Sequence, residues 1–211
     1  MSRTDRSTAG CRAAVLVLVL GAACACGRAV PPVAALAEGD TVLAFGDSLT
    51  YGTGADAHEA YPVVLAELIG RRVVASGVPG DVTADGLRRL PDALDAVQPT
   101  LLLLCMGGND MLRRIDSAET AANLRDMVRL ARARGVAVVL IGLPKPPLFP
   151  GSVAYYADIA SEFDLPFEDE ILRTLLYDAR TRSDAVHPNA AGYRKMAEAI
   201  ADLLRAAGAV Q

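Results

Sequence analysis

The segment DAVHP, residues 184–188, contains one of only two histidines in this 211-residue chain. A carboxylate three residues before a histidine can accept the Nδ1–H of the imidazole across a turn, and Pro188 stiffens that turn by fixing its own φ. The ring is then held in one tautomer, with Nε2 free to act as a general base. Because Asp-x-x-His also occurs often by chance, the motif gains meaning only if His187 has a partner to deprotonate.

A candidate partner, Ser48, lies in the stretch LAFGDSLTYG, residues 43–52, where an apolar run ends in a small, polar turn. A serine hydroxyl is a poor nucleophile until a base removes its proton. Serine is also a frequent N-cap where a helix follows a strand, so Ser48 has a purely structural alternative. The two roles are compatible, because free backbone N–H groups at such a turn could also stabilise an oxyanion.

Acyl transfer to a serine also requires hydrogen-bond donors directed at the developing negative charge. Gly80, which follows Pro79, lets a backbone N–H face a ligand with no side chain in the way. Asn109 offers a side-chain amide, although a loop asparagine commonly bonds its own backbone instead. Each residue alone has an ordinary structural explanation, so the fold must decide whether they meet.

Short apolar runs that alternate with helical patterns predict the elements that would position these residues. The expected strands are Thr41–Gly46, Arg72–Ser76, Thr100–Met106, Val136–Ile141 and a weaker Asp164–Phe167. The expected helices are Glu59–Ile69, Ala84–Val97, Ser117–Arg134, Gly151–Glu162, Asp169–Leu176 and Asn189–Ala207. This alternation predicts a parallel sheet between two helical layers. Sites in such sheets form at the carboxyl ends of the strands, where the polar stretches lie.

Four blocks in order resemble the SGNH hydrolases of the GDSL esterase/lipase family. They are GDSL at 46–49, Gly80 within GVPGDVTADGL, GGND at 107–110 and DAVHP at 184–188, so the resemblance covers about residues 40–208. The stretches VVASGVPGDVTADGLRRLP, GGNDMLR and SEFDLPF are similar to segments of the bacterial thioesterase I/arylesterase/lysophospholipase subgroup. That subgroup commonly has an asparagine where Ala75 stands here.

The resemblance implies a flavodoxin-like three-layer α/β/α sandwich with about five parallel strands. It implies that Ser48 is the nucleophile, His187 the general base and Asp184 the residue that orients the base. The implied oxyanion hole consists of the N–H groups of Ser48 and Gly80 and the side chain of Asn109.

The implied activity is hydrolysis of aryl or acyl esters, and of acyl thioesters or lysophospholipids, through an acyl-enzyme intermediate. An acyltransferase or a carbohydrate deacetylase that uses the same Ser/His/Asp site is the alternative. A non-catalytic binding module on the same scaffold is disfavoured, because both Ser48 and His187 are present.

The apolar, proline-rich loop after the fourth expected strand is a candidate wall of the acyl pocket, which this loop borders in the enzymes that the chain resembles. Pro144 and Leu148 lie in it, Met111 could form another wall, and Asp47 directly precedes the candidate nucleophile. We therefore expect Asp47, Met111, Pro144 and Leu148 to contact the substrate. The alternative is that these residues only cover the core.

The composition, the ligand spacing and the glycine pattern disfavour three other function classes. The chain is 52% hydrophobic with a formal charge of -4, so it has no basic footprint for a nucleic acid. Two separated histidines and Cys105, the one cysteine after residue 26, form no pattern of metal ligands. The first strand-to-helix turn lacks the G-x-G-x-x-G motif of dinucleotide sites. We expect no metal and no cofactor, and Cys105 as a small buried residue.

Residues 1–25 resemble a secretory signal segment. Three arginines precede a short apolar run at 13–23, and a bilayer span takes about 20 residues. LGAACACG resembles a bacterial lipoprotein processing site, with Cys24 or Cys26 as the lipidated residue, although Leu20 lies one residue farther from Cys24 than is usual. An uncleaved anchor is the alternative. We expect a linker at 26–39, a hydrolase domain at 40–211, and export as a periplasmic protein or an anchored lipoprotein.

Overall fold

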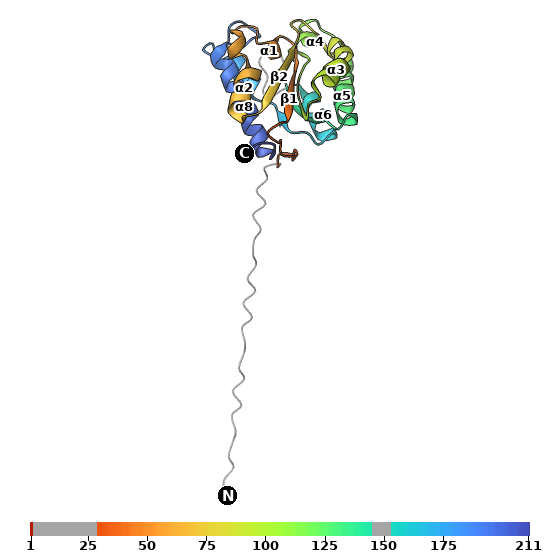
Figure 1. Cartoon of the computed structure of the whole chain (residues 1–211), viewed down its shortest axis with the longest axis vertical. Helices are drawn as coiled ribbons and strands as arrows, with labels where there is room; N and C mark the ends of the chain where they lie inside the picture. Colours follow the sequence, from red (N-terminus) through yellow and green to blue (C-terminus); the bar gives the residue numbers. More distant parts are fainter. Residues whose placement is uncertain (2–28, 145–152) are drawn as a thin grey trace.

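The computed structural model describes Met1, residues 29–144 and residues 153–211. Residues 2–25 of the expected signal segment, with Cys24 and Cys26, lie outside the described residues, and so does Leu148. Figure 1 shows the described part of the chain as a central sheet with helices on both faces. The predicted three-layer α/β/α arrangement is therefore confirmed.

Within the described residues, one sheet contains five parallel strands in the order β2-β1-β3-β4-β5. The strands are β1 (Thr41–Gly46), β2 (Arg72–Gly77), β3 (Leu101–Cys105), β4 (Ala137–Ile141) and β5 (Phe167–Glu168). The central strands β1 and β3 are buried throughout, as their continuous apolar runs predict. The edge strand β2 is partly exposed, although a nearly continuous apolar run is typical of a strand that is covered on both faces.

The fifth strand is two residues long and begins later than its sequence pattern predicts. Asp164 has a φ of 48° in the turn that follows a helix, and the Leu165 N–H donates to the carbonyl of Ala160. These residues therefore still close the preceding helix, and only Phe167 and Glu168 pair with β4. Leu165 is buried in the core although it lies in a turn. A run of apolar residues does not show whether such a residue is buried in a strand or in a turn, so the sequence pattern placed the start of the strand too early.

The six expected helices are present close to their predicted bounds. They are α2 (Tyr61–Ile69), α3 (Thr83–Val97), α5 (Ser117–Ala133), α6 (Ala154–Glu162), α7 (Ile171–Tyr177) and α8 (Ala190–Ala206). Helices α2 and α8 cover one face of the sheet, and α3, α5 and α6 cover the other (Figure 1). Three short helices were not predicted: α1 (Ser48–Tyr51), η1 (Ala57–Glu59) and α4 (Gly108–Leu112).

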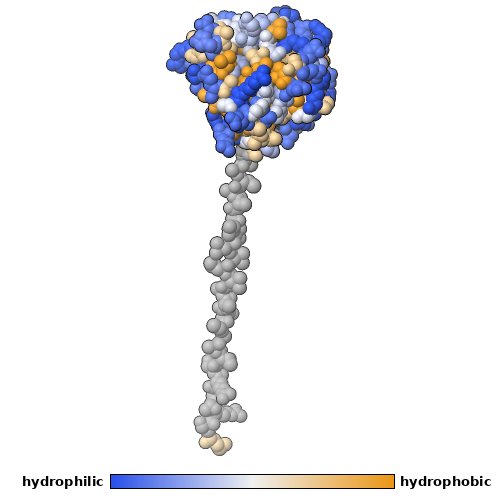
Figure 2. Space-filling model, viewed as in Figure 1, coloured by the Kyte–Doolittle hydropathy of each residue, from blue (hydrophilic) through white to orange (hydrophobic). Residues whose placement is uncertain are grey.

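Most apolar side chains are enclosed between the layers. Leu101 to Leu104 of β3 and Phe45 of β1 are fully buried, and Cys105 is a buried free cysteine, as expected. On the face shown in Figure 2, hydrophilic residues predominate and hydrophobic ones form small separate patches. No helix in the described part of the chain is long and apolar enough to cross a membrane.

Part of the expected linker is fastened to the domain. The N–H groups of Val33 and Leu36 donate to the carbonyls of Ala207 and Ala209 at the end of α8, and Leu36 is buried. The chain is therefore attached to the sandwich before β1 begins.

A buried carboxylate joins three helices on one face of the sheet. Asp110 of α4 is 1% exposed and accepts hydrogen bonds from the N–H and the hydroxyl of Thr83, at 2.8 and 2.5 Å, at the start of α3. It also accepts one from the Thr120 hydroxyl of α5 at 3.3 Å. Since a buried polar group without a partner is costly, these bonds fix α4, and hence Asn109, against its neighbours.

We predict that Asp110→Ala lowers the free energy of unfolding by about 3 kcal/mol, because the buried Thr83 donors lose their acceptor. Urea unfolding followed by circular dichroism measures the change. The matched control, Asp126→Ala, removes an exposed carboxylate that pairs with Arg129 on the same helix, and should stay within about 0.5 kcal/mol of the parent. Equal losses in the two variants would contradict the structural role of Asp110.

Candidate active site

Two distant segments meet at the carboxyl edge of the sheet. The Oγ of Ser48, the first residue of α1, lies 2.9 Å from Nε2 of His187. Nδ1 of the same imidazole lies 2.7 Å from Oδ2 of Asp184. The side chain of His187 is 18% exposed, so the ring lies largely within the protein while Asp184 is open on one side. The three side chains therefore form one continuous hydrogen-bonded chain.

The loop before α8 is organised around Asp184. Its Oδ1 accepts the N–H groups of Val186 and His187, both at 2.8 Å, while Oδ2 faces the imidazole. Partial burial raises the pKa of the Asp184 carboxyl, but the hydrogen bonds from the His187 ring and the two N–H groups outweigh it and hold the pKa below its ordinary value. Asp184 is therefore an anion at neutral pH, and an anion at Nδ1 favours the tautomer that leaves Nε2 free toward Ser48.

Asp47, and not Ser48, is the N-cap of α1. Its Oδ1 accepts the Leu49 N–H at 3.0 Å, so the alternative that Ser48 caps this helix is wrong and the serine hydroxyl stays available to His187. The end of β2 lies very close to the backbone of α1, because a Cβ on Gly77 would lie 2.3 Å from the Tyr51 nitrogen. Only glycine at this position lets the end of β2 pack directly against α1.

The Asp47 carboxyl is also an electrostatic feature of the site. It is 2% exposed, and its Oδ2 accepts the Asn109 amide at 3.3 Å. Burial, the largest influence, raises its pKa to about 6, although the Leu49 N–H and the nearby His187 act in the opposite direction. A buried carboxylate thus lies directly beneath the serine turn.

Gly80 lies in a tight turn whose last residue, Asp81, is hydrogen-bonded to Asn109. The Asp81 N–H donates to the Val78 carbonyl at 3.2 Å, Pro79 and Gly80 occupy the central positions, and Gly80 has a φ of 87°. Proline followed by a residue at positive φ is the pattern of a type II turn, which explains the glycine. The Asn109 amide donates to the Asp81 carbonyl at 2.9 Å, so it does not bond its own backbone as a loop asparagine commonly does.

A cavity of about 370 Å³ opens beside these groups, and Ser48, Asn109 and His187 line it. Its apolar wall includes Met111, Leu143, Pro144, Leu172, Leu176 and Val186. Of the residues expected to contact the substrate, Met111, Pro144 and the buried Asp47 line this cavity, and that they contact a substrate stays a prediction. Gly80 is not part of the described wall; it is connected to the site through Asp81 and Asn109.

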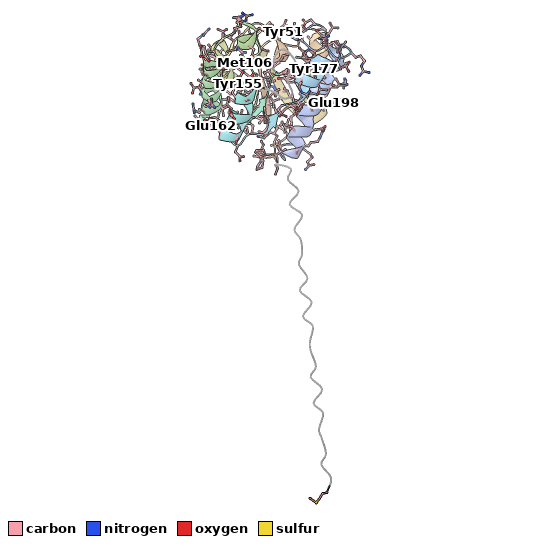
Figure 3. The ribbon with its side chains drawn as sticks, turned by 180° about the vertical axis from the view of Figure 1, so that it is seen from behind. Tyr51, Met106, Tyr155, Glu162, Tyr177 and Glu198 are labelled. Carbon is pink, nitrogen blue, oxygen red and sulfur yellow. The ribbon has the colours of Figure 1, made fainter. Side chains whose placement is uncertain are left out.

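Helix α7 forms a wall that the sequence reasoning missed. Leu172 and Leu176, four residues apart and so on one helix face, line the cavity. Tyr177, labelled in Figure 3, ends the helix, is about half exposed and also lines the cavity. The sequence could have indicated this wall, because an apolar helix that lies seven residues before the DAVHP block must end near His187. In the described residues, no group of three or more His, Cys, Asp or Glu side chains could hold a metal ion.

Comparisons with known proteins show which proteins the chain is similar to. The chain is 36% identical to esterase TesA of Pseudomonas aeruginosa over 116 residues, which cover 53% of this chain and 58% of that esterase. It is 32% identical to thioesterase 1/protease 1/lysophospholipase L1 of Escherichia coli K12 over 164 residues, covering 72% of this chain and 77% of that protein.

Solved structures show the same fold. A crystal structure of TesA superposes with a TM-score of 0.72 at 28% identity and covers 80% of this chain and 99% of that one. AlinE4, an SGNH-hydrolase family esterase, gives a TM-score of 0.62 at 31% identity, covering 81% and 97%. The profile of the GDSL-like Lipase/Acylhydrolase family matches residues 44–195. The chain therefore belongs to the GDSL-like lipase/acylhydrolase family.

Proposed function

We propose that this protein is a serine ester hydrolase that cleaves acyl and aryl esters with Ser48 as nucleophile. The observation that carries the proposal is the chain of hydrogen bonds from Asp184 through both nitrogens of His187 to Ser48 Oγ, beside an apolar cavity. A serine paired with an oriented imidazole has the activated nucleophile that acyl transfer needs. The esterase and thioesterase names of the relatives support the same activity.

The residues would act in two half-reactions. As Ser48 Oγ bonds to the carbonyl carbon, Nε2 of His187 takes the hydroxyl proton, and the carbonyl oxygen becomes an oxyanion. His187 then gives that proton to the departing alkoxide or thiolate, which leaves an acyl group on Ser48. Water, deprotonated by the same imidazole, then attacks the acyl-enzyme. The imidazolium returns this proton to Ser48 Oγ as the bond between Oγ and the acyl carbon breaks, which releases the acid and restores the serine. Asp184 remains ionised throughout and stabilises the imidazolium.

Three donors are proposed for the oxyanion: the N–H groups of Ser48 and Gly80 and the amide of Asn109. Ser48 begins α1, where first-turn N–H groups lack intrahelical acceptors. The Asn109 Nδ2 carries two hydrogens, and the shorter of its two bonds goes to the Asp81 carbonyl. Its contact with Asp47 is longer, so that hydrogen is the one free to turn toward an oxyanion.

The apolar wall supports an acyl or aryl group as the part of the substrate that enters the cavity. Burying each methylene there is worth about 0.8 kcal/mol, while the wall offers a sugar few hydrogen-bonding partners. We extend the proposal to acyl thioesters and lysophospholipids on the name of the Escherichia coli relative. We also propose export, from the composition of residues 1–25, with Cys24 or Cys26 as the lipidation candidate.

We propose that the main role of Asp47 is to position the residues of the site and not to contact the substrate. Its carboxyl is almost fully buried and is engaged with the Leu49 N–H and the Asn109 amide. It therefore fixes the start of α1 and keeps the Asn109 amide beside the serine turn, in a long hydrogen bond that an oxyanion can replace. The cost is a buried charge at neutral pH.

We predict that Ser48→Ala lowers kcat/KM for p-nitrophenyl butyrate by at least about 10³-fold, because the variant lacks the hydroxyl that is paired with His187. The absorbance of the released p-nitrophenolate at about 400 nm measures turnover, and far-ultraviolet circular dichroism checks the fold. Ser117→Ala, an exposed serine at the start of α5, is the matched control and should keep parent activity. Retained turnover in Ser48→Ala would remove the nucleophile assignment.

We predict that Asp47→Asn gains stability relative to the parent as pH rises from 4 to 7. The folded carboxyl has a pKa of about 6 and its ordinary value is 3.8, so between these values the folded state holds a proton that the unfolded state has lost. The parent is therefore destabilised by roughly 2 kcal/mol between pH 4 and pH 7, and the Asp47→Asn variant is not. Urea unfolding at both pH values measures the difference; a pH-independent difference would contradict the burial of this charge.

A further inference from the structure

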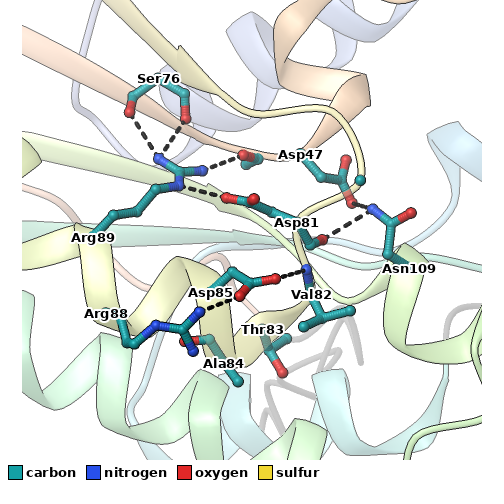
Figure 4. Close-up of polar contacts among 12 residues, drawn as sticks. Asp47, Ser76, Asp81, Val82, Thr83, Ala84, Asp85, Arg88, Arg89 and Asn109 are labelled. Atoms are coloured by element: carbon teal, nitrogen blue, oxygen red, sulfur yellow. Dashed lines mark hydrogen bonds and ion pairs between the residues drawn. The ribbon is translucent and has the colours of Figure 1, made fainter.

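Arg89, in the interior of α3, directs its guanidinium toward the carboxyl ends of β1 and β2 (Figure 4). Nε donates to the Asp81 carboxylate at 2.6 Å, and Nη1 donates to the carbonyl and the hydroxyl of Ser76 at 3.1 and 2.9 Å. Nη2 donates to the Gly46 carbonyl at 2.5 Å. The guanidinium carbon also lies 3.9 Å from the centre of the Phe45 ring.

The segments that Arg89 joins are those that carry the proposed oxyanion donors. Gly46 lies two residues before Ser48, and Asp81 directly follows Gly80. The Asp81 carbonyl in turn accepts the Asn109 amide, so the third donor is connected through the same residue (Figure 4). One side chain thus bonds residues next to two of the proposed donors, and it is connected to the third donor through Asp81.

The guanidinium is suited to this position and an ammonium is not. Arginine presents its donors in a rigid planar fork, so several acceptors on different segments are bonded at fixed relative positions. A lysine keeps the charge but has a single nitrogen at the end of a flexible stem. The Arg89 side chain is 23% exposed and its Asp81 partner 15%, so these bonds are largely shielded from water.

The preceding residue provides an internal comparison. Arg88 lies on the same helix, but its side chain is 71% exposed and pairs with Asp85 within that helix. Exposed pairs of this kind contribute little to stability or geometry. Replacing each arginine in turn by lysine therefore shows whether an effect depends on the position of Arg89 or arises from any such change on α3.

We propose that Arg89 is a positioning residue for the oxyanion hole, which sets the Gly80 N–H and the Asn109 amide at the distance from Ser48 that the oxyanion requires. The inference rests on the proposed function. Donors act when they lie about 2.7–3.1 Å from the oxyanion, and a shift of about 1 Å costs up to about 100-fold in rate. Because the oxyanion forms only on the way to the transition state, loosening these donors lowers kcat and leaves KM nearly unchanged.

The test compares the parent, Arg89→Lys and Arg88→Lys in p-nitrophenyl butyrate hydrolysis, with thermal unfolding as the fold check. We expect Arg89→Lys to lose about 10- to 100-fold in kcat with KM within about twofold, and Arg88→Lys to match the parent. A boronic acid inhibitor, whose serine adduct is tetrahedral, should lose affinity by about the same factor as kcat/KM. A role confined to folding would lower the unfolding temperature without this matched loss.

The outcomes separate the two proposals. A parent protein that hydrolyses no ester would reject the proposed function, whereas an active parent with equal kcat in Arg89→Lys and Arg88→Lys would overturn the role of Arg89. A rise in KM without a fall in kcat would overturn it as well. If Arg89→Lys does not fold, Asp81→Asn is the second variant, because it weakens the ion pair but keeps the bonds of Arg89 to Gly46 and Ser76. The proposed role predicts a several-fold lower kcat in Asp81→Asn. An unchanged kcat in this variant would overturn the role of Arg89.

Discussion

The hydrogen bond between Ser48 Oγ and His187 Nε2 joins residues that are 139 positions apart in the chain. Such a contact exists only if the carboxyl end of β1 and the loop before α8 are held at the same edge of the sheet. The buried central strands supply that frame, the Asp47 cap sets the start of α1, and Asp184 folds its own loop around the imidazole. The proposed chemistry depends on this frame, because a general base acts only within hydrogen-bonding reach of its proton.

Two buried carboxyl groups hold the site in its geometry, and their burial lowers the stability of the fold. Asp47 and Asp110 lie almost fully inside the protein, where a carboxylate is stable only if it is hydrogen-bonded. Asp110 satisfies Thr83 and so orders the helices around Asn109, while Asp47 bonds Asn109 itself. The raised pKa of Asp47 shows that this bonding does not fully offset its burial. Sites that hold donors in fixed directions commonly give up stability in this way.

Much of this structure could be predicted from the sequence because its signals are local. Continuous apolar runs mark β1 and β3, and the ordered GDSL, GGND and DAVHP blocks indicate the family. The short helix α1 could not be predicted, since four residues show no helical period, and burial of Leu165 made a closing turn look like a strand. The contribution of α7 to the cavity and the span of Arg89 depend on tertiary contacts, and no local pattern encodes those.

The most direct test of the central claim is to find which side chain becomes covalently modified. Intact-mass and peptide-level mass spectrometry after exposure to a small alkyl fluorophosphonate would locate the adduct. The Ser48–His187 pair predicts one adduct on the peptide that contains Ser48, and far slower labelling when His187 is replaced by alanine. Labelling at another residue, or labelling of Ser48 at an equal rate without His187, would contradict the account.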